Sequence, residues 1–241
     1  MVRELIGSWW RRAVADWLVR MSTWTARAGV SGSDSRHARR FQHVGAGSAF
    51  GFPPGPTMGE RWIRIGADTL LGPGVVLSAG MWPDEPLDPP AGWAVRIGDR
   101  CNIGRHTALV GRVGIDVGDD VTLGPAVYVT DHNHDYSEPD LPISRQWVVE
   151  NRVTIGAGSW VGTGAVILPG TQLGRQVAVA ASSVVRGVVP DRCVVAGAPA
   201  VVVRRWDELA GGWDPPLAGA QAAAADHAPR GWYDHVTSPG R

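Results

Sequence analysis

The sequence predicts an all-β solenoid of short stacked strands, with a helical segment before it and a loosely ordered tail after it. Two observations lead to this prediction. Aliphatic residues return at every sixth position through most of the chain, and 32 glycines supply the tight turns that short strands need. The segments on either side lack this six-residue rhythm.

The first segment, residues 1–43, is expected to contain an amphipathic helix over residues 2–28, because apolar side chains recur there at helical spacing. One possibility is that this helix packs on the open end of the solenoid or on a partner subunit. The alternative is that its tryptophans contact a lipid surface or a lipid-linked substrate. The apolar residues at this spacing are Leu5, Trp9, Val14, Trp17, Leu18, Met21 and Trp24.

The repeat occupies residues 44–206. A period of six fits neither a 3.6-residue helix nor simple strand alternation, but it fits short strands separated by turns. Positions one and five of each unit then point inward, and stacked coils bury columns of like residues. Insertions interrupt the phase at 81–96, near 111–116 and at 135–152. Aliphatic first positions include Ile97, Ile103, Leu109, Val117, Leu123, Val129, Ile155, Val161, Ile167, Leu173, Val179 and Val185.

The last segment, residues 207–241, is rich in alanine and proline and is expected to be a flexible tail. The chain carries 23 basic and 23 acidic residues, so no basic excess points to a nucleic-acid partner. Two cysteines make no disulfide framework, and no run of about 20 apolar residues predicts a membrane span. We therefore expect a cytoplasmic protein, membrane-associated if its first helix contacts lipid.

One stretch, "YVTDHNHDYSEPDLP" at 128–142, concentrates ionisable side chains. With Val129 at position one, Asn133 should point inward. His134 should then point outward at the edge of the 135–152 insertion, with His132 on the turn. A histidine there can act as a general base at neutral pH.

The repeats, together with the terminal "VVAGAPAVVVRRW" at 194–206, resemble those of the hexapeptide-repeat acyltransferases, in particular the sugar and polysaccharide O-acetyltransferases. This resemblance implies a left-handed parallel β-helix, a homotrimer, and acetyl transfer from acetyl-CoA to a saccharide or glycolipid acceptor. The resemblance also implies that the catalytic histidine lies in the unit that begins at Val129.

Two histidines compete for that role. Counting without gaps from the preceding repeats places the base at His134, and a match on the threonine of "VTDH" places it at His132; we favour the ungapped count. Asp131 is one of the groups that can orient the ring, beside Asp135 and backbone carbonyls. By resemblance, the backbone amide of Thr163 stabilises the oxyanion.

The resemblance, together with side-chain direction and chemistry, assigns residues to the two substrates, although the arginines could instead lie on a solvated coil edge and the loop aromatics could instead pin the loop to its scaffold. For the coenzyme A side these are Trp160, Thr163, Ala181, Ser183, Arg186, Arg204 and Arg205. For the acceptor side they are Tyr136, Arg145 and Trp147, all in the 135–152 insertion. The asparagine and aspartate that hold the acceptor in galactoside-type relatives would fall near Gly104 and Arg112. Neither residue type is present there, so we do not transfer that substrate.

Two other functions fit parts of the pattern. A zinc enzyme like the γ-class carbonic anhydrases would use His106, His132 and His134 as ligands. A non-catalytic β-helix scaffold would keep the repeats alone. The terminal signature and Trp160 favour the acyltransferase, for which no metal is expected. The isolated histidines outside the coils, His37 among them, are expected at the surface.

Overall fold

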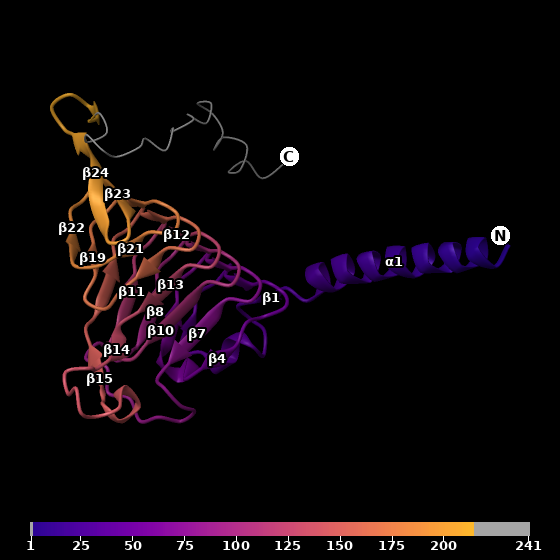
Figure 1. Ribbon diagram of the computed structural model, residues 1–241, viewed down its shortest axis with the longest axis horizontal. Coiled ribbons are helices and arrows are strands. Elements are labelled where there is room, and N and C mark those ends of the chain that lie inside the picture. The colour runs from indigo at the N-terminus through magenta and orange to yellow at the C-terminus, as the bar shows by residue number, and fades with distance from the viewer. Residues whose placement is uncertain (1, 215–241) are drawn as a thin grey trace.

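The computed structural model describes residues 2–214, without the side chains of residues 2–9 and 11. The chain winds into a tapering solenoid whose strands stack into three sheets (Figure 1). Most of the predicted tail, residues 215–241, lies outside the described residues. Its first residues continue the last strands of the solenoid.

The three walls are a ten-stranded, a seven-stranded and a six-stranded sheet. The ten-stranded sheet contains β1 (Ser31–Gly32), β3 (Ala49–Phe50), β6 (Leu70–Leu71), β9 (Asn102–Ile103), β12 (Thr122–Leu123), β17 (Trp160–Val161), β20 (Ala178–Val179), β23 (Cys193–Gly197), β24 (Ala200–Asp207) and β25 (Gly212–Trp213). The seven-stranded sheet contains β2 (His43–Val44), β5 (Ile63–Ile65), β8 (Val95–Ile97), β11 (Ile115–Val117), β16 (Val153–Ile155), β19 (Gln172–Leu173) and β22 (Val188–Val189). The six-stranded sheet contains β4 (Thr57–Met58), β7 (Val76–Ala79), β10 (Ala108–Gly111), β13 (Tyr128–Thr130), β18 (Val166–Ile167) and β21 (Val184–Val185).

The six-residue period corresponds to one strand and one turn, as predicted. Successive coils pair in parallel and in register, so that Leu109, Val129 and Ile167 form one inward column with side chains at most 1% exposed. Fifth positions are inward too. The buried hydroxyl of Thr107 donates to the carbonyl of Gly124 in the next coil at 2.8 Å, which satisfies a polar group inside the core.

Glycine at the second position of a unit is explained by close coil stacking. A Cβ added at Gly162 would lie 2.6 Å from the backbone nitrogen of Ala181 in the next coil. The fourth position has a left-handed backbone at many turns, with φ of 68° at Gly164 and 58° at His106. His106 therefore occupies a turn position whose conformation favours glycine.

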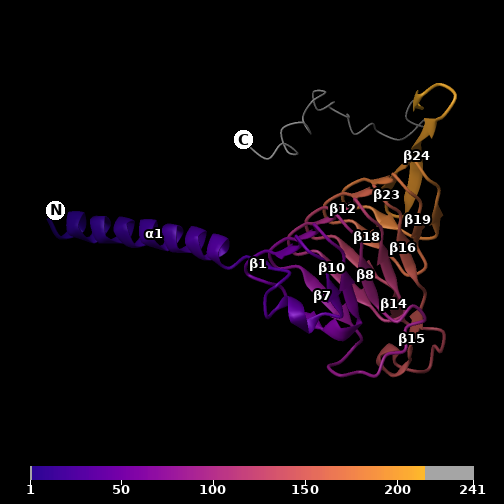
Figure 2. The ribbon, with the colours of Figure 1, turned by 180° about the vertical axis from the view of Figure 1, so that it is seen from behind.

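The N-terminal segment forms α1 (Val2–Ala28), as the sequence predicts. The helix projects from the narrow end of the solenoid (Figures 1 and 2). It does not cap this chain's own solenoid, because its described side chains are exposed, apart from the half-buried Thr25.

The rest of the predicted N-terminal segment packs on the first coils. The strand β1 pairs antiparallel with β3, and the short helices η1 (Ala38–Arg40) and η2 (Glu60–Trp62) flank this region. His37 is not at the surface as expected. Its ring is half-buried, with centroids 4.8 Å from Phe50 and 5.6 Å from Phe41. Burial and the nearby Arg40 lower the pKa of His37, although Glu60 opposes them.

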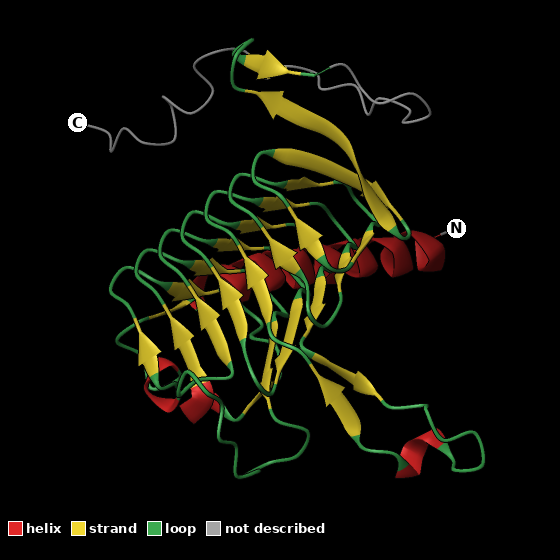
Figure 3. Ribbon diagram, turned by 90° about the vertical axis from the view of Figure 1, so that its left-hand side faces the viewer, coloured by secondary structure: helices red, strands yellow, loops and turns green. Residues whose placement is uncertain are grey.

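A hairpin leaves the solenoid where the sequence predicts the long insertion. Its strands β14 (His132–His134) and β15 (Val148–Glu150) pair antiparallel, and η3 (Ile143–Arg145) lies in the loop between them (Figure 3). The predicted boundary was wrong by four residues, because the chain departs from the coil at Asp131 rather than at 135. Asn133 is consequently exposed on the hairpin and does not point inward.

Candidate active site

The site is built around Asp131, the residue that ends the coil before the hairpin. Its carboxylate is completely buried and accepts three backbone N–H groups from the turn at 112–114. The donors are the amides of Arg112, Val113 and Gly114, whose nitrogens lie 2.8, 2.8 and 2.7 Å from Oδ2. This turn is the two-residue phase break that the sequence shows near 111–116. A buried charge needs such compensation, so the turn and the aspartate fix each other.

Asp131 also holds the ring of His132. The His132 Nδ1 lies 2.9 Å from Asp131 Oδ1, and the imidazole is 14% exposed. An ionised carboxylate only accepts hydrogen bonds, so Nδ1 carries the proton and Nε2 of the neutral ring is free to accept one. A histidine held in this way has a fixed orientation and tautomer, as a general base requires.

His134 has a different environment. Pleating places His132 and His134 on the same face of β14, but His134 lies farther along the hairpin and is exposed. Its ring has no hydrogen-bond partner within residues 2–214. It lines a cavity of about 440 Å³ together with Tyr136 and Arg186, two residues that the sequence assigned to the acceptor and to coenzyme A.

A buried ion network supports the base of the hairpin. The guanidinium of Arg112, 10% exposed, pairs with the carboxylates of both Glu85 and Glu150. Burial lowers the pKa of Arg112, but the hydrogen bonds to Glu150 and Glu85 outweigh it and raise the pKa overall. Glu85 belongs to the insertion after β7 and Glu150 to β15, so this one arginine joins two insertions that are distant in sequence.

An aromatic pair lies on the same network. The ring of Trp147 stands 5.5 Å from the Arg112 guanidinium and 6.4 Å from the ring of Trp82, measured to ring centroids. Both tryptophans remain about half exposed. Sequence reasoning had identified Trp147 but missed Trp82, Glu85, Arg112 and Glu150. The phase breaks at 81–96 and 111–116 were the signal that could have found them.

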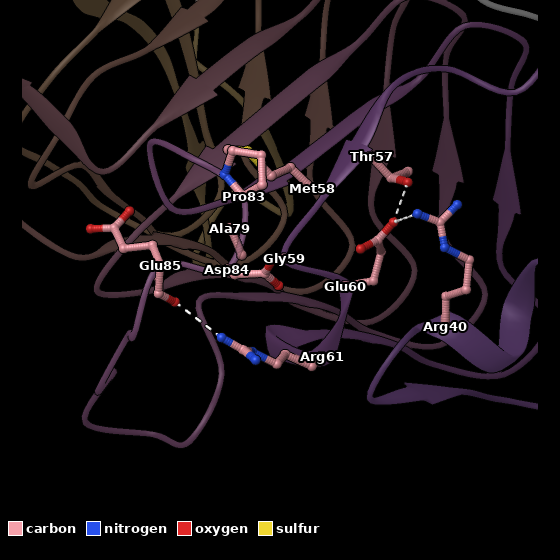
Figure 4. A pocket seen from close by; sticks show the side chains of 10 residues that line it. All are labelled: Arg40, Thr57, Met58, Gly59, Glu60, Arg61, Ala79, Pro83, Asp84 and Glu85. Carbon is pink, nitrogen blue, oxygen red and sulfur yellow. Dashed lines mark hydrogen bonds and ion pairs between the residues drawn. The ribbon is translucent and has the colours of Figure 1, made fainter.

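A second cavity, of about 470 Å³, lies on the other side of the insertion after β7 (Figure 4). The carboxylate of Glu60 accepts hydrogen bonds from Thr57 and Arg40 there, at 2.6 and 2.5 Å. Arg61 donates to the carbonyl of Glu85 at 3.2 Å, while the Glu85 carboxylate points away toward Arg112. Glu85 therefore connects this cavity to the ion network beneath the hairpin.

The residues assigned to coenzyme A lie at different corners of the solenoid. Thr163 and Ala181 occupy stacked turns that lead from the ten-stranded to the six-stranded sheet, and the Ser182 amide donates to the Thr163 carbonyl at 2.9 Å. Trp160 is 54% exposed on β17. The turn that carries His132 follows the opposite end of the six-stranded sheet, so one chain does not bring Thr163 to His132.

The remaining assigned residues have mixed environments. Ser183 is buried and accepts from the Gly197 amide at 3.2 Å, so its side chain is unavailable to an outside ligand. Arg204 donates to the carbonyl of Asp214 at 2.8 Å. Arg205 is exposed, with Nη1 3.8 Å from Cys193 Sγ. Arg145 is exposed in η3. Among residues 2–214, no three histidine, cysteine or acidic side chains are grouped to hold a metal.

The chain is similar to known proteins over this region. The family model described as "Hexapeptide repeat of succinyl-transferase" matches residues 94–131 and 149–186. Nodulation protein L of Rhizobium meliloti is 33% identical over 147 residues, which are 59% of this chain and 75% of that protein. A structure of AntD, an N-acyltransferase from Bacillus cereus, superposes with a TM-score of 0.62 at 22% identity, covering 75% of this chain and 92% of AntD.

Other curated relatives match in part. A putative lipopolysaccharide biosynthesis O-acetyl transferase, WbbJ of Escherichia coli, is 30% identical over 48% of this chain and 63% of its own length. A probable acetyltransferase of Mycobacterium tuberculosis is 34% identical over 46% of this chain and 37% of its own length. The chain thus spans less than two thirds of these two relatives. The matches confirm the fold class as a left-handed parallel β-helix.

Proposed function

Because the chain belongs to the hexapeptide-repeat acyltransferase family, we propose that it is an O-acetyltransferase that moves acetyl from acetyl-CoA to a hydroxyl of a saccharide, polysaccharide or glycolipid precursor. The observation that carries this proposal is the hydrogen-bonded pair of the buried Asp131 and the partly buried His132 at the root of an exposed hairpin. The names of WbbJ and of galactoside O-acetyltransferase from Lactococcus lactis, 34% identical over 42% of this chain, support a saccharide acceptor.

In the proposed reaction, His132 is the general base. Its Nε2 removes the proton of the acceptor hydroxyl while the oxygen attacks the thioester carbonyl. The tetrahedral intermediate then collapses, the carbon–sulfur bond breaks, and the imidazolium returns the proton to the departing thiolate. Such proton transfer contributes about 10²–10⁴-fold to the rate. Asp131 fixes the tautomer throughout and stabilises the imidazolium as it forms.

Thr163 is proposed to stabilise the oxyanion from a second copy of the chain. Its amide has no acceptor among the described residues, so it is free to donate. The six-stranded sheet separates Thr163 from His132 within one chain, and a neighbouring copy is needed to bring such corners together. The outer face of that sheet supports this packing, because an apolar column of Val76, Ala108, Tyr128, Val166 and Val184 runs along it in register. We propose a homotrimer on this basis.

The acceptor is proposed to bind against the hairpin. Exposed aromatic rings suit the apolar faces of sugars, and Trp147, Trp82 and Tyr136 supply three of them on the hairpin and on the insertion that adjoins it. Coenzyme A is proposed to run past Thr163, Ala181 and Trp160 of one copy. Arg186, which lines the cavity that holds His134, is proposed to pair with a phosphate of the cofactor.

The test is release of free coenzyme A from acetyl-CoA in the presence of oligosaccharides, nucleotide sugars and glycolipid precursors. Acceptor-dependent release should fall at least about 10²-fold in His132→Ala and much less in the matched variant His134→Ala. Loss only in His134→Ala would support the ungapped count instead. If none of the acceptors elicits release of coenzyme A by the wild type, and acetyl-CoA does not raise its Tm, the proposed activity is wrong.

A further inference from the structure

The helix α1 carries a row of exposed apolar side chains that the proposed reaction does not use. Trp10, Val14, Trp17, Met21 and Trp24 recur at alternating spacings of four and three residues and therefore share one face. Trp10, Trp17 and Trp24 are 52%, 59% and 63% exposed. We call these five side chains the tryptophan stripe. Three large aromatic rings in solvent are costly, so the stripe needs a partner.

The charge of the helix indicates what that partner is. Residues 2–28 contain five arginines but only Glu4 and Asp16 as acids, a net charge of +3 in a chain whose total is zero. Two of the arginines, Arg20 and Arg27, lie exposed in a ridge along one edge of the stripe. Arginines next to a row of tryptophans are typical of helices that lie in the interface of an anionic membrane.

A second copy of the helix fits this surface less well. The alternating spacing of the stripe would suit a coiled coil, which normally places opposite charges at the positions flanking its seam. Here the flanking positions are Arg11, Ala13, Leu18, Arg20 and Thr25, which include no acidic residue and so offer no such pair. In a bundle of three such helices, arginines would flank the seam with no acidic residue there to pair with them.

We propose that α1 docks the protein on an anionic lipid surface, with the helix lying in the plane of the interface. The tryptophan stripe would enter the boundary between headgroups and acyl chains, roughly 5–10 Å deep, while the arginine ridge contacts lipid phosphates. The helix projects from the solenoid in both opposed views (Figures 1 and 2), so the rest of the chain does not cover the stripe. None of the helices within residues 2–214 has the length and apolarity for a membrane span.

The experiment is vesicle flotation of the full chain. Vesicles of phosphatidylcholine alone are compared with vesicles of an equimolar mixture of phosphatidylcholine and phosphatidylglycerol. The protein should float with the mixed vesicles and not with phosphatidylcholine alone, and rising salt should release it. Tryptophan fluorescence should shift to the blue on binding, because the stripe leaves water.

Two matched substitutions on α1 test the stripe itself. Trp17→Ser should lower the partition into mixed vesicles on the order of tenfold. Val19→Ser should not, because Val19 is 65% exposed on a face about 160° away around the helix. Both should keep the wild-type Tm, since both side chains lie in solvent.

Two results would overturn the proposal. One is that the wild type fails to float with either vesicle. The other is that Trp17→Ser and Val19→Ser behave alike. If Trp17→Ser leaves flotation unchanged and instead reduces the oligomer size in light scattering, the partner of the stripe is a second copy. None of these readouts depends on acetyl transfer, so the proposed activity and the proposed docking fail separately.

Discussion

Asp131 carries its charge where solvent is excluded, and three backbone amides and one imidazole N–H compensate it. An asparagine at this position cannot replace the carboxylate, because its NH₂ group would face N–H groups that need an acceptor. The aspartate therefore has two roles, holding the turn at 112–114 in place and fixing the His132 ring. A substitution of Asp131 should therefore affect stability and catalysis together, because one carboxylate serves both roles.

Asp131→Asn should lower kcat on the order of 10²-fold while the KM for acetyl-CoA stays near the wild-type value. It should also cost about 1–3 kcal/mol of folding free energy, since a buried donor loses its acceptor. Steady-state kinetics, the pH profile of kcat and thermal melting measure these effects. Asp135→Asn is the matched control, because Asp135 is only partly buried and its carboxylate accepts from the amide of the exposed Ser137. Equal losses in the two variants would contradict the assigned role.

His37 supplies a pH prediction at the first coil. Its pKa is lowered by burial and by Arg40, so protonation favours the unfolded chain. The stability linked to His37 is therefore complete above about pH 6.5 and is lost as the pH falls through the lower pKa of the folded state. As the pH is lowered, the Tm of His37→Phe should therefore fall less steeply than the Tm of the wild type. His43→Phe, at an exposed position of β2, is the matched control, and identical slopes for all three proteins would refute the prediction.

The sequence identified both histidines and Asp131 but not their geometry. The hexapeptide phase assigns directions only while the coil continues, and it fails at Asp131, where the chain enters the hairpin. Nothing in residues 131–134 signals that exit locally. It depends on the amides at 112–114, which are distant in sequence. His37 was misplaced for the same reason, since the phenylalanines around it come from separate elements.

At the scale of elements, the hairpin β14–β15 and the insertion after β7 form one unit through Arg112. The carboxylate partners of Arg112 are Glu85, whose side chain is 5% exposed, and Glu150, whose side chain is 26% exposed. Both charges therefore depend on the arginine. The sequence predicted both insertions from the lost phase. It could not predict their pairing, because an insertion has no repeat neighbour to set its register.

Arg112→Met should destabilise the protein by about 3–5 kcal/mol, because it leaves two carboxylates without their counter-charge. Adding Glu85→Gln and Glu150→Gln to that variant should restore most of the loss, since the buried charges are then gone. Chemical denaturation measures both. Arg100→Met is the control, because the exposed Arg100–Asp120 pair contributes little. If the triple variant is no more stable than Arg112→Met, the loss does not come from unpaired charge.

At the scale of the whole molecule, the period of six was enough to predict the solenoid and the direction of most side chains. Each coil repeats the inward positions of the previous one, so columns such as Leu109, Val129 and Ile167 follow from the sequence directly. Handedness and subunit number came only from the family resemblance. The relation between copies is also invisible in one chain, although the proposed site depends on it.

A site shared between copies makes a prediction that no single chain can satisfy. Ala181 is exposed on the corner assigned to coenzyme A, so Ala181→Trp should fold normally and block the cofactor. His132→Ala should bind the cofactor and lack the base. Each variant alone should be inactive, but after co-expression about a quarter of the sites in randomly mixed trimers should combine an intact His132 with an intact Ala181 from the neighbouring chain. Coenzyme A release by the mixture would therefore recover to a measurable fraction of the wild-type rate. A mixture as inactive as its components, with mixed oligomers verified by affinity tags, would place the whole site within one chain.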